Sequence, residues 1–226
     1  DVAAYGVVPL ENSTEGAISR TLDLLFESSL KLCGEIGLPV RHNLLSKEKP
    51  ENIEKIYSHS QSLSQCQKWL GQHFPSAHLI PVASNAAAAK LVATEARSAA
   101  IAGRIAGEHF GLTVIHSSIE DKPDNTTRFG VISKTAVGTS GSDKTSIVLA
   151  AQHKPGAILS LLEPLAENGI SMTRLESRPS GLGLWEYMFF IDLEGHKDDE
   201  VMQAALSEIQ SKSGFFKILG SYPKTV

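Results

Sequence analysis

The chain has 226 residues, 42% of them hydrophobic, and a formal net charge of −4. This length allows one large domain or two small ones, and the composition is ordinary for a globular protein. The chain has no basic run and no apolar run near the roughly 20 residues that span a membrane, which argues against nucleic-acid and membrane partners.

The first predicted element is a buried strand over residues 5–10, followed by a polar run that includes Asn12 and Ser13. Ser13 or Thr14 is the predicted N-cap of a helix, whose apolar residues Ile18, Leu22, Leu25 and Phe26 recur at helical spacing. A strand that leads into a polar loop and a helix N-terminus is typical of anion-binding sites. The alternative is that Ser13 only caps the helix.

Strands and helices then alternate up to residue 134. Strands are predicted over residues 30–40, 42–46, 79–82, 99–103 and 112–115, and helices over 63–74, 86–96 and 104–110. This alternation predicts a mainly parallel α/β architecture, in which ligands bind at the carboxyl ends of the strands. His59, with Gln61 and Gln65, is predicted to line such a pocket; an exposed helix start is the alternative.

Residues 124–130 (DNTTRFG) place an amide, two hydroxyls and a guanidinium directly before a predicted strand. Arg128 could hold a carboxylate through two hydrogen bonds, and Thr126 or Thr127 could donate a hydrogen bond to a departing oxygen. The alternative is an Asx or Ser/Thr turn with a surface arginine.

The pattern changes after a Gly-, Ser- and Thr-rich linker over residues 136–143. The order of predicted elements beyond it is βαββαβ, which is the ferredoxin-like arrangement. A domain of this size exposes a sheet edge or a helix face, which the pairing of two copies would cover.

Several short motifs in fixed order resemble those of prephenate dehydratases with a C-terminal ACT regulatory domain. In the first part they are residues 8–13 (VPLENS), 16–18 (GAI), 58–61 (SHSQ), 65–66 (QC) and 125–129 (NTTRF). In the second part they are residues 155–157 (PGA) with Leu159, and residues 173–179 (TRLESRP). The resemblance implies a dehydratase domain over residues 1–138 and an ACT domain over residues 144–226.

The resemblance also implies a fold and a set of functional residues. The dehydratase domain is expected to have two α/β lobes, like periplasmic binding proteins, with the active site in the cleft between them. The family pattern assigns catalysis to Thr127 and Arg128. It assigns substrate binding to Asn12, Ser13, Ser58, His59, Gln65, Thr126 and Phe129. It assigns allosteric phenylalanine binding, between paired ACT domains, to Gly156, Ala157, Leu159, Glu176, Ser177, Arg178 and Pro179.

By the same resemblance, the substrate is prephenate, the effector is L-phenylalanine, and the protein is a cytoplasmic homodimer or homotetramer. Family members carry about seventy further residues in front of this first strand, judged from domain size, so we expect part of the first lobe to be missing here. No cofactor motif is present, and the eight histidines form no metal-ligand pair, so neither a cofactor nor a metal is predicted. Cys33 and Cys66 share no metal-type spacing and are predicted to be reduced core thiols.

Prephenate loses carbon dioxide and a ring hydroxyl to become aromatic, so the enzyme needs mainly to help hydroxide leave. Thr127 is the predicted donor to that oxygen, and Arg128 orients either Thr127 or a substrate carboxylate. Two alternatives remain. One is a phenylalanine-binding regulatory dimer with an impaired cleft, and the other is a hydrolase of small amides, esters or lactones that uses Ser13, His59 or Thr127.

Overall fold

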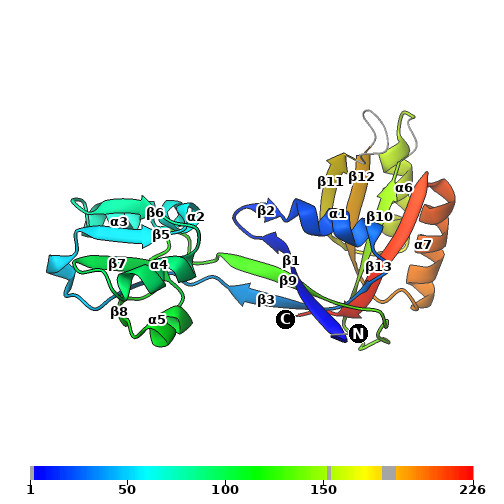
Figure 1. Ribbon diagram of the computed structural model, residues 1–226. Coiled ribbons are helices and arrows are strands. Elements are labelled where there is room, and N and C mark those ends of the chain that lie inside the picture. The colour runs from blue at the N-terminus through cyan, green and yellow to red at the C-terminus, as the bar shows by residue number, and fades with distance from the viewer. Residues whose placement is uncertain (1–2, 152–153, 180–186, 226) are drawn as a thin grey trace. The chain divides into compact units, whose positions relative to one another are not determined.

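The computed structural model describes residues 3–151, 154–179 and 187–225 (Figure 1). The chain folds into two compact units. One contains the chain up to Leu38 and again from Thr126 onward, and the other spans Pro39–Asn125. The C-terminal region therefore belongs to the same unit as the first strands of the chain. Residues 181–183 (GLG), which we expect to connect the two middle strands of the C-terminal part, lie outside the described residues.

The unit spanning Pro39–Asn125 is built on a mixed five-stranded sheet with strand order β6-β5-β7-β4-β8. Its strands are β4 Asn43–Ser46, β5 Lys55–Ser58, β6 His78–Pro81, β7 Ser98–Ala102 and β8 Thr113–His116. Strand β5 runs parallel to β6 and β7, whereas β4 is antiparallel to β7 and β8. A 3-10 turn, η1 Pro50–Asn52, precedes β5.

The helices of this unit are α2 Ser60–Gln65, α3 Gln67–His73, α4 Asn85–Val92 and α5 Arg104–Phe110. The structure confirms the predicted start of α4, where Ser84 accepts a bond from the Ala87 N–H, and the predicted end of α5, where Gly111 has a φ of 65°. The predicted end of α4 is wrong, because the helix stops at Val92 and not at residue 96. The single helix expected over residues 63–74 is wrong: it is interrupted at Cys66. Cys66 is fully buried, and burial, followed by the charges of Asp121 and Glu120, raises the pKa of its thiol to about 12. It is therefore an unreactive core thiol.

In the other unit, the N-terminal strands form a four-stranded sheet of order β2-β1-β9-β3. The elements are β1 Tyr5–Asn12, β2 Gly16–Ala17, α1 Ser19–Glu27, β3 Lys31–Pro39 and β9 Thr126–Ser133. Strand β1 is antiparallel to both β2 and β9. The expectation of a mainly parallel sheet is therefore wrong. The chain leaves this unit after β3 and returns at β9. Strands and helices therefore alternate along the sequence although successive strands do not all belong to one sheet.

The start of α1 also differs from the prediction. Residues after β1 turn back at once, with Glu11 paired to Ala17 and Asn12 to Gly16, which has a φ of 86°. Ile18 then takes the N-cap position of α1 without a side-chain cap bond. Neither Ser13 nor Thr14 caps the helix, so the anion-binding helix N-terminus expected behind Asn12 does not form.

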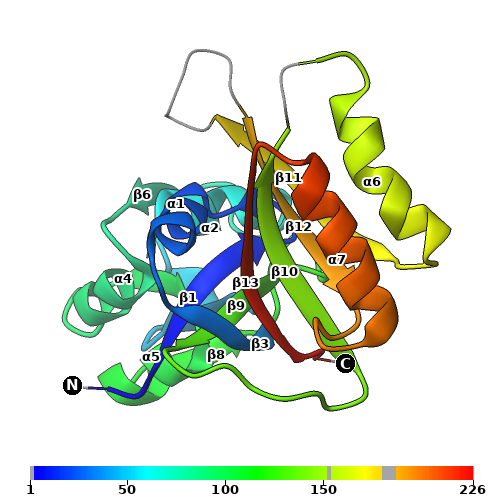
Figure 2. The same cartoon turned by 90° about the vertical axis from the view of Figure 1, so that its right-hand side faces the viewer.

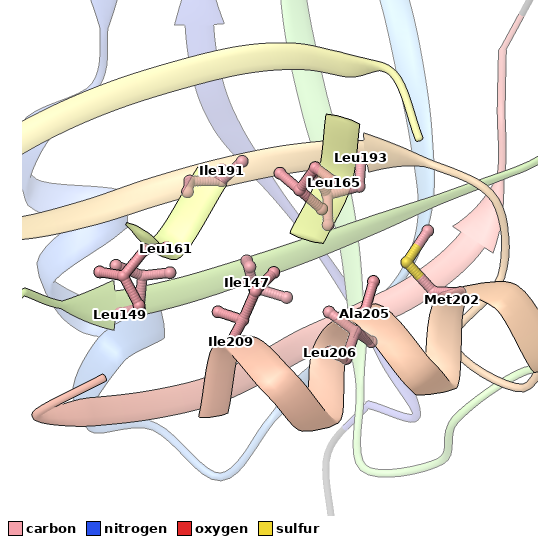
Figure 3. Close-up of a cluster of buried hydrophobic side chains, with 10 residues drawn as sticks. All are labelled: Ile147, Leu149, Leu161, Leu165, Ile191, Leu193, Met202, Ala205, Leu206 and Ile209. Carbon is pink, nitrogen blue, oxygen red and sulfur yellow. The ribbon is translucent and has the colours of Figure 1, made fainter. Parts of the chain in front are cut away.

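The C-terminal region has the predicted βαββαβ order and the ferredoxin-like strand order β11-β12-β10-β13. Its elements are β10 Asp143–Ala150, α6 Ala157–Glu167, β11 Met172–Pro179, β12 Tyr187–Glu194, α7 Glu200–Lys212 and β13 Phe215–Pro223. The helices α6 and α7 lie on one face of this sheet (Figure 2). Figure 3 shows the core between them, where Leu161 and Leu165 of α6 and Ile209 of α7 meet Ile147 and Ile191 of the sheet.

The opposite face of the ferredoxin-like sheet packs against the N-terminal sheet. Val148 and Phe190, which alternate with the helix-facing residues, join Leu10, Leu22 and Leu32 in a second buried core. At one point the backbones themselves approach: a Cβ on Gly220 of β13 would overlap the Leu32 carbonyl of β3. The C-terminal domain and the strands that carry Asn12 and Thr127 are therefore one packed body.

Candidate active site and regulatory strand

Thr127 and Asn12 lie opposite each other on β9 and β1, and the Asn12 amide nitrogen donates to the Thr127 hydroxyl oxygen at 3.0 Å. The orientation of the amide is fixed, because its oxygen accepts bonds from the Thr14 backbone N–H at 3.0 Å and the Thr14 hydroxyl at 2.6 Å. Thr127 thus receives a hydrogen bond, and no group in the described part of the chain accepts its own hydroxyl hydrogen. That hydrogen is available to an external acceptor.

Two further predicted residues extend this pairing. Ser13 donates its backbone N–H to the Thr126 carbonyl at 2.9 Å and accepts the Thr126 N–H on its hydroxyl at 3.0 Å. Phe129 follows on β9, on the same side of the strand as Thr127 because side chains alternate. The structure therefore brings Asn12, Ser13, Thr126 and Thr127 together at the end of one strand pair.

Arg128 points to the other side of β9. Its Nε donates to Glu11 at 2.7 Å, its Nη1 to Glu35 at 2.9 Å and its Nη2 to Asp192 at 2.6 Å. Burial alone would lower the pKa of Arg128, but the charges of Asp192 and Glu11 and the hydrogen bond to Glu35 hold that pKa above its ordinary value. Each of the three guanidinium nitrogens already donates to a carboxylate of the protein. This arrangement does not fit the prediction that Arg128 takes part in catalysis directly or binds a substrate carboxylate.

The Ser58–His59 motif lies in the other unit, at the turn from β5 into α2. His59 is the N-cap of α2 and accepts a bond from the Gln61 N–H at 3.3 Å. Its backbone N–H donates to the Asn85 side-chain oxygen at 3.1 Å, and Ser58 and Ser62 donate their hydroxyls to the same oxygen at 2.9 and 3.0 Å. Asn85, the first residue of α4, therefore fixes this turn. The Ser84–Asn85 pair in the sequence indicated a helix start but not this contact.

Gln65 ends α2, and its side-chain oxygen receives two bonds. One comes from His42 Nε2 at 2.7 Å and the other from Asn125 Nδ2 at 3.3 Å. His42 is buried, and its backbone N–H donates to Glu120 at 2.9 Å. Gln65 therefore joins the two segments through which the chain enters and leaves this unit.

The residues predicted to bind phenylalanine lie on α6 and β11. Gly156, the N-cap of α6, has a φ of 75°; Ala157 is buried and Leu159 is 73% exposed. On the sheet-edge strand β11, Glu176 and Arg178 are half-buried, whereas Ser177 and Pro179 are exposed. Arg178 donates two hydrogen bonds, both 3.1 Å long, to Asp23 of α1. It is thus paired with the N-terminal part of its own unit.

Sequence analysis missed the three carboxylates that surround Arg128. Glu11, Glu35 and Asp192 are separated by long stretches of chain and stand in no recognisable motif. A surface hollow of about 560 Å³ lies at the end of β1 and β9 away from Asn12 and Thr127. It is lined by Tyr5, Gly6 and Ile132 among others, and no predicted site residue lines it.

In the described residues, no group of three His, Cys, Asp or Glu side chains could hold a metal ion. Among the same residues, none of the helices has the length and the apolar character of a membrane-spanning segment.

These features define an α/β protein with a C-terminal ACT domain. The family model for prephenate dehydratase matches residues 1–137, and the ACT domain model matches residues 145–210. The prephenate dehydratase of Methanocaldococcus jannaschii is 38% identical over 229 residues, which cover 99% of this chain and 82% of that protein. The chain belongs to the prephenate dehydratase family.

Relatives with a second activity are also similar. The bifunctional chorismate mutase/prephenate dehydratase of Neisseria gonorrhoeae is 52% identical over 228 residues, covering 99% of this chain and 63% of that protein. The chain thus spans less than two thirds of the length of such relatives.

Two solved structures have closely similar folds. Prephenate dehydratase from Arthrobacter aurescens, in complex with L-Phe, superposes with a TM-score of 0.88 at 32% identity, covering 98% of this chain and 75% of that chain. GqqA, described as a novel type of quorum quenching acylase, superposes with a TM-score of 0.87 at 28% identity, covering 99% and 83%.

Proposed function

We propose that this protein is a prephenate dehydratase that converts prephenate to phenylpyruvate, carbon dioxide and water, and that L-phenylalanine regulates it. The observation that carries the activity is the Asn12–Thr127 pair. The Asn12 amide donates to the Thr127 hydroxyl oxygen at 3.0 Å and occupies one of its lone pairs. The hydroxyl hydrogen of Thr127 therefore points away from Asn12. Family membership supplies the substrate.

The reaction needs one proton donor and no electron sink. The carbon–carbon bond to the ring carboxylate breaks, its electron pair forms a ring double bond, and the C–O bond to the ring hydroxyl breaks. The departing hydroxide takes a proton and leaves as water. We assign that proton, or the hydrogen bond that precedes its transfer, to Thr127, which regains the proton from solvent before the next turnover. A bond received from Asn12 alone does not make a threonine acidic, so the orientation of the O–H toward the leaving oxygen must supply most of the effect.

The decisive experiment replaces Thr127 in the full natural protein and follows phenylpyruvate by ultraviolet absorbance. Thr127→Ala should lower kcat by about 100-fold or more, the range for a lost proton donor. Thr127→Ser keeps the hydroxyl and should retain much of the turnover. Thr127→Val, which keeps the shape without the hydroxyl, is the matched control and should resemble alanine. Equal turnover in the serine and valine variants would contradict the assignment.

We assign the remaining predicted substrate-binding residues in two groups. Asn12, Ser13, Thr126 and Phe129 accompany Thr127, and Ser58, His59 and Gln65 form a second group in the other unit; this second assignment is supported by the family motif alone. Arg128 we assign to positioning rather than to contact with the substrate. We retain domain boundaries at residues 1–138 and 144–226, which the matches to the two family models support.

For regulation, we propose that phenylalanine binds at Gly156, Ala157 and Leu159 with Glu176–Pro179, between the ACT domains of a cytoplasmic homodimer or homotetramer. The edge position of β11 and the 73% exposure of Leu159 support an interface there. Titration calorimetry with phenylalanine should give saturable heat that Leu159→Glu abolishes, and sedimentation should show the loss of the oligomer. No heat at millimolar phenylalanine would contradict this.

A second candidate function is hydrolysis of an acyl amide. It is favoured by one observation, the TM-score of 0.87 with a structure described as a quorum quenching acylase. The same protein preparation should be assayed with an N-acylated lactone, with release of the fatty acid as readout. Release that survives Thr127→Ala and exceeds the rate with prephenate would favour this function over dehydration.

A further inference from the structure

A cluster of six charged side chains joins the N-terminal sheet to the ACT sheet. Each of six strands contributes one residue. The N-terminal sheet supplies Glu11 (β1), Glu35 (β3) and Arg128 (β9), and the ACT sheet supplies Lys144 (β10), Arg174 (β11) and Asp192 (β12). Three are positive and three negative, so the ion cluster is neutral.

Three ion pairs cross between the two sheets. Arg128 reaches Asp192 at 2.6 Å, and Glu11, which also binds Arg128, reaches Arg174 at 2.9 Å. Lys144 donates to both oxygens of Glu35, at 2.8 and 3.0 Å. Within the N-terminal sheet, Arg128 also pairs with Glu35, which links the Lys144–Glu35 pair to the rest of the ion cluster.

The ion cluster is largely withdrawn from water. The side chains of Glu35 and Asp192 are 3% and 5% exposed, and those of Lys144, Arg174 and Arg128 are 11%, 11% and 15% exposed. Removing one partner of a buried ion pair leaves an uncompensated charge. Glu11 is more exposed, at 32%. A gradual shift of the two sheets against each other is disfavoured, because it would break the Arg128–Asp192 and Lys144–Glu35 pairs in a poorly hydrated place. Such an interface favours discrete arrangements.

One end of the cluster adjoins the reactive pair. Glu11 and Arg128 lie opposite each other on β1 and β9, and the next pair in the register is Asn12 and Thr127. The cluster thus fixes the spacing of the two strands one residue away from the 3.0 Å bond between Asn12 and Thr127.

The other end of the ion cluster adjoins β11, the strand that carries the proposed phenylalanine-binding residues Glu176–Pro179. Arg174 lies on β11, two residues before Glu176, and Arg178 further along β11 is bound to Asp23 of α1. Asp192 is itself held in place, because its second oxygen accepts the Ser146 hydroxyl at 2.6 Å. Displacement of β11 would therefore act on Glu11 directly, through Arg174.

We propose that Arg174 and Asp192 are positioning residues, through which the ACT sheet sets the geometry of the Asn12–Thr127 pair. This inference rests on the proposed function. A phenylalanine-induced displacement of β11 changes the Arg174–Glu11 contact, and the ion cluster carries the change to β1 and β9. Because coupling between two sites is reciprocal, a substitution that weakens the cluster on the ACT side should change both the geometry of the Asn12–Thr127 pair and the phenylalanine concentration that gives half of the effect.

The test compares Asp192→Asn with Glu194→Gln in the full natural protein. Both remove one negative charge from β12, but Glu194 pairs with Lys224 in an exposed position, at 2.7 Å, outside the cluster. Asp192→Asn should lower kcat at least tenfold with KM for prephenate within threefold, and should shift the half-effective phenylalanine concentration at least tenfold. Glu194→Gln should change each by less than twofold. A lower Tm in Asp192→Asn with unchanged kinetics, or equal effects in both variants, would overturn the proposal.

Arg174→Gln is the second variant, for use if Asp192→Asn does not fold. Arg174 Nη2 is buried and has no hydrogen-bond partner in the described residues, so this member of the cluster is the least satisfied and its loss should be tolerated. Its kcat should fall less than that of Asp192→Asn, but its response to phenylalanine should shift as much. A wild-type response in this variant would overturn the proposal.

A readout without turnover separates this inference from the proposed function. Amide hydrogen exchange in the segments that contain Asn12 and Thr127 should be at least tenfold faster in Arg174→Gln than in Glu194→Gln. If the wild-type protein forms no phenylpyruvate, the proposed function fails, and the exchange comparison still decides the positioning role. Equal exchange in the two variants would overturn it.

Discussion

The two groups of predicted site residues are held in place by different physical means. Thr127 and Asn12 lie beside a buried cluster of charges that involves strands of two sheets. Ser58 and His59 are held by neutral hydrogen bonds, which converge on Asn85 inside the Pro39–Asn125 unit. The first arrangement connects the predicted site residues to the ACT domain. The second stabilises a turn through contacts within one unit.

This contrast has consequences for how each group responds to change. Charge pairs in a buried place fail abruptly when one partner is lost, whereas neutral hydrogen bonds between amides and hydroxyls cost less to lose. The Thr127 group should therefore be sensitive to substitutions in the ACT domain and to acid. The His59 group should respond to changes within its own unit only.

The largest expected effect on stability comes from Arg128→Met. This change leaves three carboxylates near one another without their shared cation, and the expected loss is about 3–5 kcal/mol in the free energy of unfolding. Urea denaturation should measure it. Arg97→Met is the control, because Arg97 pairs with Glu54 in an exposed position and should contribute less than about 1 kcal/mol. Similar losses in both variants would show that burial of the ion cluster does not increase its contribution to stability.

The ion cluster also shows where prediction from sequence ends. The ferredoxin-like order could be predicted, because turn residues and apolar periodicity are local. The role assigned to Thr127 came from the resemblance to a family and not from the local pattern. The partners of Arg128 could not, since Glu35 and Asp192 are 93 and 64 residues away from it along the chain. The parallel sheet was wrongly predicted for a related reason. Local patterns identify strands, but they do not show which strands pair. Here β1 pairs with β9, and the whole Pro39–Asn125 unit lies between them in the sequence.

The next largest effect should follow from Gly220→Ala. A Cβ at this position would overlap the Leu32 carbonyl, and backbone on both sides prevents easy relief, so we expect a loss of about 3 kcal/mol. Gly138→Ala is the matched control, because a Cβ there meets nothing within 4 Å. Thermal unfolding should show a clear fall in Tm for the first variant alone. If the contact between β13 and β3 matters for positioning Thr127, kcat should fall as well.

Asn85→Ala should have an intermediate effect. The Ser62 hydroxyl and the His59 N–H lose their shared acceptor, which we expect to cost about 1–3 kcal/mol, whereas the Ser58 hydroxyl keeps the Ile101 carbonyl as an acceptor at 2.8 Å. If His59 contacts the substrate, KM for prephenate should rise about fivefold while kcat and the phenylalanine response stay within threefold. Asn85→Asp keeps the acceptor oxygen and should restore most of the binding. A large fall in kcat with unchanged KM would show that this turn acts on the chemistry instead.

The smallest effect, and the most direct contrast between the two groups, is in acid. Burial alone would raise the pKa of Glu35, but its bonds to Lys144 and Arg128 outweigh burial and hold that pKa below the ordinary value of 4.5. A carboxyl with a lowered pKa stabilises the fold fully above its unfolded value, and that contribution is lost as the pH falls through about 4.5 toward the folded value. Glu35→Gln should therefore flatten the decline in unfolding free energy between about pH 5 and pH 3, at the expense of stability at pH 7. Asn85→Ala should cost the same at both pH values, because an amide and two hydroxyls bind no proton in this range. Urea titrations of the two variants at pH 7 and pH 4 test this, and a pH-independent cost for Glu35→Gln would show that its charge is not what stabilises the sheet pair.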